Sequence, residues 1–229
     1  GDIDAATLGP LLDKVFGALP AKGDLMTVTP VRMDAAGRRI FVDLKVPQAV
    51  LNFGGAGIAR KDSDFIPAFI LNHIMGGGSF SSRLYREVRE KRGLVYGVYT
   101  YLLPLDETAL LMGGTQTRAD KADETLDLIQ SEIKQLIESG PSAEELEKAK
   151  SYLKGSYALN FDTSSKIAGQ LVQIQLDELG IDYIERRTGL IDKVTLDDIK
   201  RVAKRLLDGG ILVTVVGRAQ DTPAKKEGG

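Results

Sequence analysis

Apolar residues recur along this chain in two spacings, at every second position in some segments and at every third or fourth in others. The first spacing is typical of strands and the second of helices. In the first half of the chain, strands are predicted over 39–46, 50–59, 94–103 and 108–117, and helices over 64–75 and about 80–91. The last two of these strands are joined by Pro104-Leu-Asp-Glu107, which predicts an antiparallel hairpin.

The second half of the chain is mostly helical in pattern. Helices are predicted over 120–138, 142 to about 160, 163–179, 181–191 and 195–207, and an apolar strand over 211–216. Ser142 and Glu145 have the spacing of a capping box, in which each side chain bonds to the backbone of the other residue. Because paired strands precede grouped helices, we expect an α+β fold with an antiparallel-dominated β-sheet flanked by helices.

The two ends of the chain are expected to lie outside the main domain, which we place at 39–217. Residues 1–20 predict a short helix capped by Asp4, and residues 21–38 a polar linker. Residues 218–229 are polar and charged and are expected to form a disordered tail.

Composition and charge narrow the function only broadly. The chain has 229 residues, of which 43% are hydrophobic, so it can bury a full core. Its 30 basic and 32 acidic residues give a net charge of −2, and no global field favours nucleic acid. No segment approaches the roughly 20 apolar residues of a membrane span. The chain has no cysteine, which is compatible with a reducing cytosol and with a periplasm in which no disulfide is formed, so the localisation stays open.

The most informative segment begins at Gly76-Gly-Gly78 and ends at Tyr99. Three glycines are expected to let the backbone turn sharply into a basic helix, which stops at Gly93. An aromatic and β-branched run follows and predicts a strand. Arg89 then lies near the end of the helix, and Tyr96 lies seven positions later on the strand. Both side chains can point to one place across this corner.

This segment resembles the second half-domain of the M16 zinc metallopeptidases, the family of insulinase, pitrilysin and the processing peptidases. The resemblance extends from roughly Arg39 to Gly217 and implies a LuxS/MPP-like metallohydrolase half-domain. It implies that Arg89 and Tyr96 are catalytic residues that reach over the active site of a zinc-binding half. Tyr96 would donate a hydrogen bond to the substrate carbonyl or the developing oxyanion, and Arg89 would hold a backbone carbonyl of the substrate.

The resemblance also bears on metal, partners and the N-terminal segment. M16 catalysis requires a His-x-x-Glu-His motif with a distal Glu, but this chain has one histidine, His73, and no cysteine. We therefore expect no metal ligand and no cofactor in this chain, with zinc in the partner half. The expected partners are a zinc-binding M16 half-domain or subunit and an unfolded peptide. Gly1-Asp-Ile-Asp4 matches a turn near the end of the first half-domain, so residues 1–20 are interpreted as the residual C-terminal helix of a missing N-terminal half.

Several alternatives remain open in the sequence. Arg92 lies closer to Tyr96 than Arg89 does and is the rival functional arginine. Gly76, Gly77 and Gly78 either bind substrate or only form the turn into the helix, and the Lys-Ser/Thr of a phosphate-binding loop does not follow them. Strand alternation predicts that Tyr99 faces away from Tyr96. His73 is expected to be a core histidine or to lie just behind a site.

Two functions of different class fit these residues. The first is the C-terminal half, or the non-zinc subunit, of an M16-type zinc peptidase, inactive alone. It would complete the substrate chamber and supply an Arg/Tyr pair for peptide-bond hydrolysis. The second is a non-catalytic scaffold, comparable to the core subunits of respiratory complexes that derive from processing peptidases. Retention of both Arg89 and Tyr96 favours the peptidase.

Overall fold

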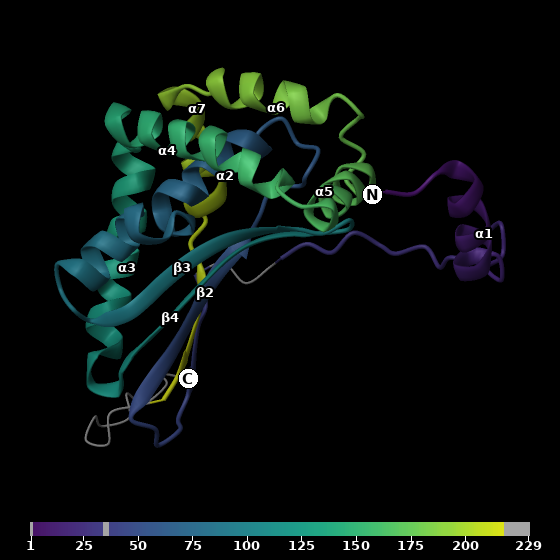
Figure 1. The fold of residues 1–229 in the computed structure, drawn as a ribbon. Helices are drawn as coiled ribbons and strands as arrows, with labels where there is room; N and C mark the ends of the chain where they lie inside the picture. Colours follow the sequence, from purple (N-terminus) through teal and green to yellow (C-terminus); the bar gives the residue numbers. More distant parts are fainter. Residues whose placement is uncertain (1, 34–36, 218–229) are drawn as a thin grey trace.

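A five-stranded sheet forms the centre of the computed structural model, which describes residues 2–33 and 37–217 (Figure 1). Its strands are β1 (Arg39–Val42), β2 (Gln48–Ala56), β3 (Val95–Pro104), β4 (Ala109–Arg118) and β5 (Leu212–Val216). Their order across the sheet is β1-β5-β2-β4-β3. Among the described strands, β1 and β5 run parallel, and β2–β5, β2–β4 and β3–β4 are antiparallel pairs. The prediction of an antiparallel-dominated α+β fold is confirmed, as is the β3–β4 hairpin.

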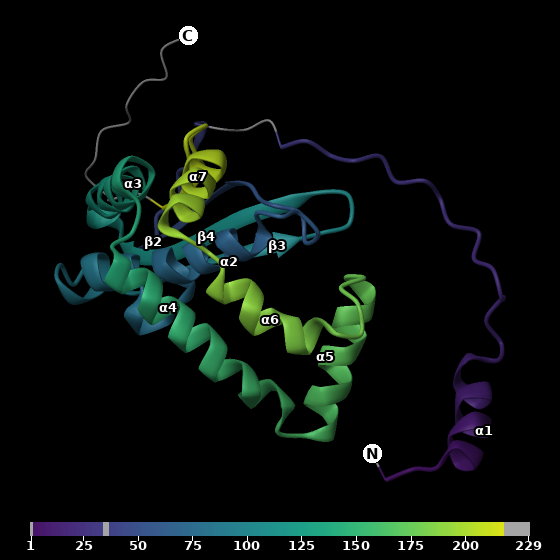
Figure 2. The same ribbon diagram turned by 90° about the horizontal axis from the view of Figure 1, so that it is seen from above.

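Helices lie on one side of this sheet. They are α2 (Phe65–Asn72), α3 (Ala122–Ser139), α4 (Ala143–Gly155), α5 (Ser164–Leu176), α6 (Tyr183–Asp192) and α7 (Leu196–Leu207). Figure 2 shows α2, α3 and α7 over the sheet, with α4 and α6 beside α2. Leu51 and Phe53 of β2 are buried under these helices, whereas Asn52 between them is exposed. The core therefore lies between the sheet and α2, α3 and α7, and the described chain leaves the opposite face of the sheet open.

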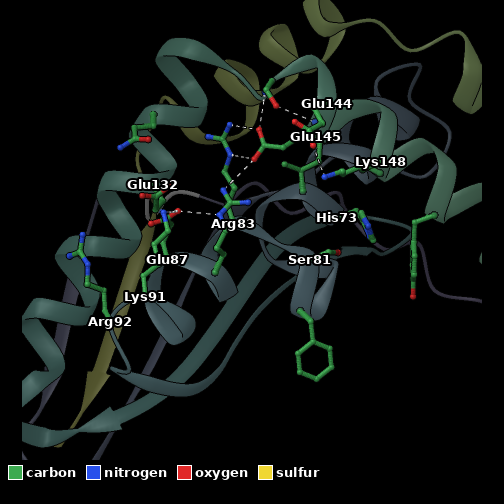
Figure 3. Close-up of a pocket in the computed structure, with 17 residues that line it drawn as sticks. His73, Ser81, Arg83, Glu87, Lys91, Arg92, Glu132, Glu144, Glu145 and Lys148 are labelled. Carbon is green, nitrogen blue, oxygen red and sulfur yellow. Dashed lines mark hydrogen bonds and ion pairs between the residues drawn. The ribbon is translucent and has the colours of Figure 1, made fainter.

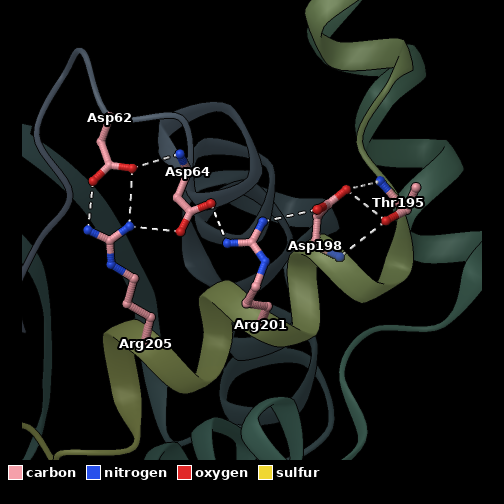
Figure 4. A network of polar contacts seen from close by, with 6 residues as sticks. All are labelled: Asp62, Asp64, Thr195, Asp198, Arg201 and Arg205. Atoms are coloured by element: carbon pink, nitrogen blue, oxygen red, sulfur yellow. Dashed lines mark hydrogen bonds and ion pairs between the residues drawn. The ribbon is translucent and has the colours of Figure 1, made fainter.

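An ion-pair network fastens α7 to the segment that leads into α2 (Figure 4). Arg205 donates to both oxygens of Asp62, at 3.1 and 2.6 Å, and to Asp64 Oδ2 at 2.7 Å. Arg201 donates to the other oxygen of Asp64 and, at 3.0 Å, to Asp198, which also completes a capping box with Thr195. Hydrogen bonds from the arginines lower the pKa values of Asp62 and Asp64 against the opposing effect of burial. Both carboxylates are thereby kept ionised where α2 begins.

The N-terminal helix α1 (Ala5–Phe16) lies apart from the sheet (Figures 1 and 2). The Asp4 side chain accepts a hydrogen bond from the Thr7 backbone N–H at 2.8 Å, as expected for its cap. No residue of α1 is buried, although Leu8, Leu11 and Leu12 form an apolar stripe along the helix. Residues 21–33 contain no helix or strand, and the expected tail at 218–229 lies outside the described residues.

Several predicted boundaries are wrong by a few residues. The strand predicted over 39–46 ends at Val42, and the next one begins at Gln48 and ends at Ala56. The helix predicted from 142 to about 160 ends at Gly155 and continues as a 3₁₀ segment, Ser156–Phe161. The helices predicted over 163–179 and 181–191 are likewise shorter than expected at one or both ends. Such ends depend on capping contacts that periodicity does not report.

The segment around the glycines differs most from the expectation. Helix α2 passes into a π-helical turn (His73–Gly77), and a 3₁₀ turn (Ser79–Ser81) follows. In place of a continuous helix over 80–91, the chain extends at Ser82 and then forms a second π-helical turn (Tyr85–Glu90). The two π turns therefore flank a short corner that contains the 3₁₀ turn, and π-helical turns are frequent at functional sites.

The glycines of this corner are required by close approach rather than by a left-handed turn. Positive φ occurs at other glycines of the described chain, but at none of Gly76, Gly77 and Gly78. A Cβ on Gly76 would lie 2.7 Å from Thr100 Oγ1 of β3, and one on Gly77 would lie 2.5 Å from Asn72 Nδ2. The sharp-turn explanation was wrong: Gly76 lets the corner pack directly on the edge strand, and Gly77 lies against Asn72 at the end of α2.

Candidate functional site

A β-bulge in β3 sets the direction of Tyr96. Val95 pairs with Thr117 and Val98 with Thr115, so Tyr96 and Gly97 together face the single residue between those threonines. The Thr115 hydroxyl donates to the Gly97 carbonyl at 2.7 Å, and the Thr117 hydroxyl donates to the Leu94 carbonyl at 2.7 Å. These bonds fasten the bulge from both sides.

The bulge also overturns the expected alternation of the tyrosines. Two successive residues, Tyr96 and Gly97, are exposed before Val98 returns to the core, so Tyr99 is exposed as well. Tyr96 and Tyr99 consequently line the same groove on the open face of the sheet. The prediction that they face opposite sides was wrong, because one extra residue shifts the register of every side chain that follows it.

Tyr96 stands in a groove of about 510 Å³ between the open face of the sheet and the glycine corner. The groove wall includes Gly76, Gly77, Phe80 and Tyr85, but not Gly78. The Tyr96 side chain is 92% exposed, and its hydroxyl has no hydrogen-bond partner among the described residues. None of the lining residues carries a charge: Gln48, Val50, Asn52, Gly76, Gly77, Ser79, Phe80, Tyr85, Tyr96, Gly97, Val98, Tyr99, Thr100, Thr115 and Gln116.

Arg89 lies beside this groove, on the second π turn. Its guanidinium carbon is 5.2 Å from the centroid of the Tyr85 ring, which is part of the groove wall. Arg89 is exposed and makes no ion pair with any described residue. Its rival Arg92 instead lines the neighbouring charged cleft, and it too is without an ion-pair partner in the described chain. The structure therefore brings Tyr96, Gly76 and Gly77 into one groove and places Arg89 on its wall residue Tyr85.

The charged cleft has a volume of about 980 Å³ and lies between the second π turn and helices α3 and α4 (Figure 3). Arg83 binds Glu145 through two hydrogen bonds, Nε to Oε1 at 2.7 Å and Nη2 to Oε2 at 2.6 Å. Burial opposes ionisation of Glu145, but the bonds from Arg83 and Ser142 outweigh it and lower the pKa of Glu145 to about 2. Glu145 thus serves both the predicted capping box and an ion pair with a distant segment.

Glu132 was not singled out by sequence reasoning. It is only 7% exposed, it lines the charged cleft, and its side chain makes no hydrogen bond or ion pair with any described residue. Burial raises its pKa, and the negative charge of Glu87 adds to that effect. Its position, three residues after Ile129 and four before Leu136, falls on the apolar stripe of α3 and could have marked it as an inward-facing acid.

Similarity to known proteins shows the family to which this chain belongs. The family model described as Peptidase M16 inactive domain matches residues 1–153. The chain belongs to the M16 peptidase family. It is 31% identical, over 195 residues, to an uncharacterized zinc protease of Streptomyces coelicolor, and the match covers 84% of this chain and 42% of that protein. It is 30% identical over 173 residues to the mitochondrial-processing peptidase subunit alpha of Pongo abelii, covering 71% of this chain and 33% of the subunit.

The fold agrees with this assignment. A crystal structure of a peptidase M16 inactive domain from Pseudomonas fluorescens superposes with a TM-score of 0.85 at 30% identity, covering 96% of this chain and 52% of that chain. This M16 chain thus spans about half the length of its zinc protease relatives and of this solved structure. The expected half-domain of the M16 family is confirmed.

The residues of this M16 domain do not fit a zinc ion. A zinc site of the His-x-x-Glu-His type needs two histidines, and this chain has one, His73, directly after α2. The His73 ring is buried and stacks on Tyr152 at a centroid distance of 5.0 Å, and burial lowers its pKa. Among residues 2–33 and 37–217, no group of three or more His, Cys, Asp or Glu side chains could hold a metal ion.

No helix in the same described ranges has the length and hydropathy to cross a membrane.

Proposed function

We propose that this chain is the non-zinc half of an M16 zinc peptidase and completes the substrate chamber formed with a zinc-binding half or subunit. Three observations support the proposal: relatives named as zinc proteases, a chain of about half their length, and residues that do not fit zinc. A zinc ion held by the other half would supply the activated water for peptide-bond hydrolysis. The isolated chain would not hydrolyse peptides.

The single observation that carries the proposal is the state of Tyr96. Tyr96 is 92% exposed at a bulge fastened by two threonine bonds, so its hydroxyl is held beside the glycine corner with its donor available to a ligand. In the assembled enzyme its hydroxyl would donate to the carbonyl oxygen of an unfolded peptide and to the oxyanion that develops from it. Tyr96 is thus proposed as a catalytic residue.

Arg89 is proposed as the second catalytic residue, in preference to Arg92. It lies on the wall residue Tyr85 of the neutral groove, whereas Arg92 lines the charged cleft. A guanidinium without a carboxylate partner keeps its donors for the backbone carbonyl of the peptide. Gly76 and Gly77 are proposed to bind substrate, because a wall without side chains lets a peptide backbone approach closely. Gly78 is not part of this wall, and a Cβ there would lie 2.7 Å from the His73 carbonyl oxygen.

We further assign residues 1–20 to the other half. The apolar stripe of α1 is exposed throughout, and an amphipathic helix of this kind is stable when its stripe is buried. Residues 21–38 would then be the connection between the halves. Residues 39–217 would form the C-terminal half-domain itself.

The test is reconstitution with the zinc-binding half, identified by pull-down and mass spectrometry. The purified complex should hydrolyse an unfolded peptide such as reduced, carboxymethylated insulin chains, and the chain alone should not. Arg89→Ala should raise KM and lower kcat, because the contact forms before chemistry and persists through it. Arg92→Ala is the matched control and should stay within a few-fold of the wild type.

Two outcomes would contradict parts of this proposal. A zinc-loaded complex that hydrolyses no unfolded peptide would favour the non-catalytic scaffold. Loss of cleavage in Arg92→Ala with normal cleavage in Arg89→Ala would reverse the arginine assignment and leave the peptidase assignment standing.

A further inference from the structure

Arg89 is held differently from its basic neighbours on the same segment. Arg83 binds Glu145, and both Arg86 and Lys91 bind Glu87, at 3.2 and 2.8 Å. The contact of Arg89 is with an aromatic ring, that of Tyr85, four residues earlier and on the same side of the helical turn. A cation is attracted to the face of such a ring, because the ring quadrupole is negative there.

Tyr85 is in turn held by a second ring. Its side chain is buried, and the Phe80 ring meets it edge to face at a centroid distance of 4.9 Å and an interplanar angle of 78°. Phe80 itself is 75% exposed and lines both the neutral groove and the charged cleft. The Tyr85 hydroxyl has no hydrogen-bond partner among the described residues. Tyr85 therefore contacts Phe80 and Arg89 through its ring.

We propose that Tyr85 is a positioning residue for Arg89, and that Phe80 fixes the ring of Tyr85 so that the guanidinium stays beside the groove. The proposal rests on the proposed function, since it gives Arg89 its orientation toward a peptide. An ion pair would also restrain Arg89, but it would occupy the N–H donors and neutralise the charge. The face of a ring restrains the guanidinium while leaving its donors and charge available.

The first test uses the chain alone and reads the position of the guanidinium directly. In a sample labelled with ¹⁵N-arginine, the Arg89 Nε–Hε resonance, assigned by its loss in Arg89→Lys, should be shifted by the ring current of Tyr85. Tyr85→Phe keeps the ring and should keep the shift, whereas Tyr85→Leu should abolish it. Phe80→Ala removes an exposed side chain, so it should leave folding intact and reduce the shift. An Arg89 resonance that is unchanged in both Tyr85→Leu and Phe80→Ala overturns the proposal.

The second test uses the reconstituted peptidase and a double-mutant cycle. Tyr85→Leu should raise KM by about 2- to 5-fold, the range for an exposed cation–π contact, and Tyr85→Phe should restore the wild-type value. In the Arg89→Ala background, Tyr85→Leu should add no further change in KM, because the group it positions is absent. Tyr101→Leu, on the same strand as Tyr96 but outside the groove wall, is the control and should leave KM unchanged.

The outcomes separate this inference from the proposed function. Full additivity of Tyr85→Leu and Arg89→Ala overturns the positioning role, even with both variants impaired. Normal activity of Arg89→Ala instead overturns the role of Arg89 in the proposed function, and the ring-current experiment then still decides whether Tyr85 holds the guanidinium.

Discussion

Glu145→Gln offers a sharp test of the contact between the second π-turn segment and α4. Two oxygens of Glu145 accept from Arg83 at 2.7 and 2.6 Å, and the carboxylate is 20% exposed. The fall of its pKa from 4.5 to about 2 corresponds to at most about 3 kcal/mol of folding free energy at neutral pH. Because the pair is partly solvated, we expect Glu145→Gln to lower the free energy of unfolding by about 2 kcal/mol at pH 7.

The dependence on pH has a definite sign. Above pH 4.5 the carboxylate is ionised in the folded and unfolded chains, and the ion pair contributes in full. As the pH falls toward about 2, the unfolded chain takes up the proton first, so the wild type loses this contribution. Glutamine does not titrate and still accepts the capping-box bond from Ser142. The difference between the two proteins should therefore be constant from pH 7 to 5 and shrink below that.

Urea unfolding followed by circular dichroism, at a series of pH values, measures this difference. In thermal unfolding at pH 7, a loss of about 2 kcal/mol should lower the thermal midpoint of Glu145→Gln by about 4–8 °C for a chain of this size. The control is Glu144→Gln on the same turn, whose carboxylate pairs with Lys148 and is 74% exposed; it should leave the urea midpoint nearly unchanged. Equal stability of Glu145→Gln and Glu144→Gln at pH 7, or a difference between the wild type and Glu145→Gln that is as large at pH 3 as at pH 7, would refute the reasoning.

Four further predictions follow from the same structure. In the reconstituted peptidase, Tyr96→Phe should lower kcat by about 10²-fold with an unchanged thermal midpoint, and normal turnover would remove Tyr96 from the mechanism. Asp64→Asn should lower the free energy of unfolding by about 1–2 kcal/mol, measured in urea, because Arg201 and Arg205 each lose one of their two carboxylate partners. The exposed Asp123→Asn should change it little. Gly54→Ala should cost about 1–3 kcal/mol, since its Cβ would lie 2.3 Å from the Leu111 carbonyl oxygen, and Gly55→Ala, with 3.9 Å to its nearest atom, should be tolerated. Elemental analysis of the purified chain should find zinc well below one per chain, and a stoichiometric ion bound within the chain would contradict the half-site interpretation.

The sequence by itself determined the order and type of most elements. Local signals are strong where they are complete within a few residues, as in the capping box of Ser142 and Glu145 or the cap at Asp4. The hairpin of β3 and β4 was likewise readable, because its turn and both alternating strands are contiguous. The M16 resemblance rested on the 76–99 segment for the same reason: its glycines, basic residues and tyrosines are close together in the chain.

Only the tertiary structure decided how that segment presents its side chains. The bulge at Tyr96 and Gly97 depends on threonines of another strand, so alternation along β3 gave the wrong face for Tyr99. The close packing of Gly76 depends on Thr100 of the edge strand, which lies more than twenty residues away in the sequence. Arg83 and Arg89 lie in the same basic segment, yet Arg83 forms an ion pair with Glu145 of α4, whereas Arg89 packs against the ring of Tyr85. Periodicity records which residues face inward, whereas the partner of a charged group such as Arg83 is fixed by a contact with a segment far away in the chain.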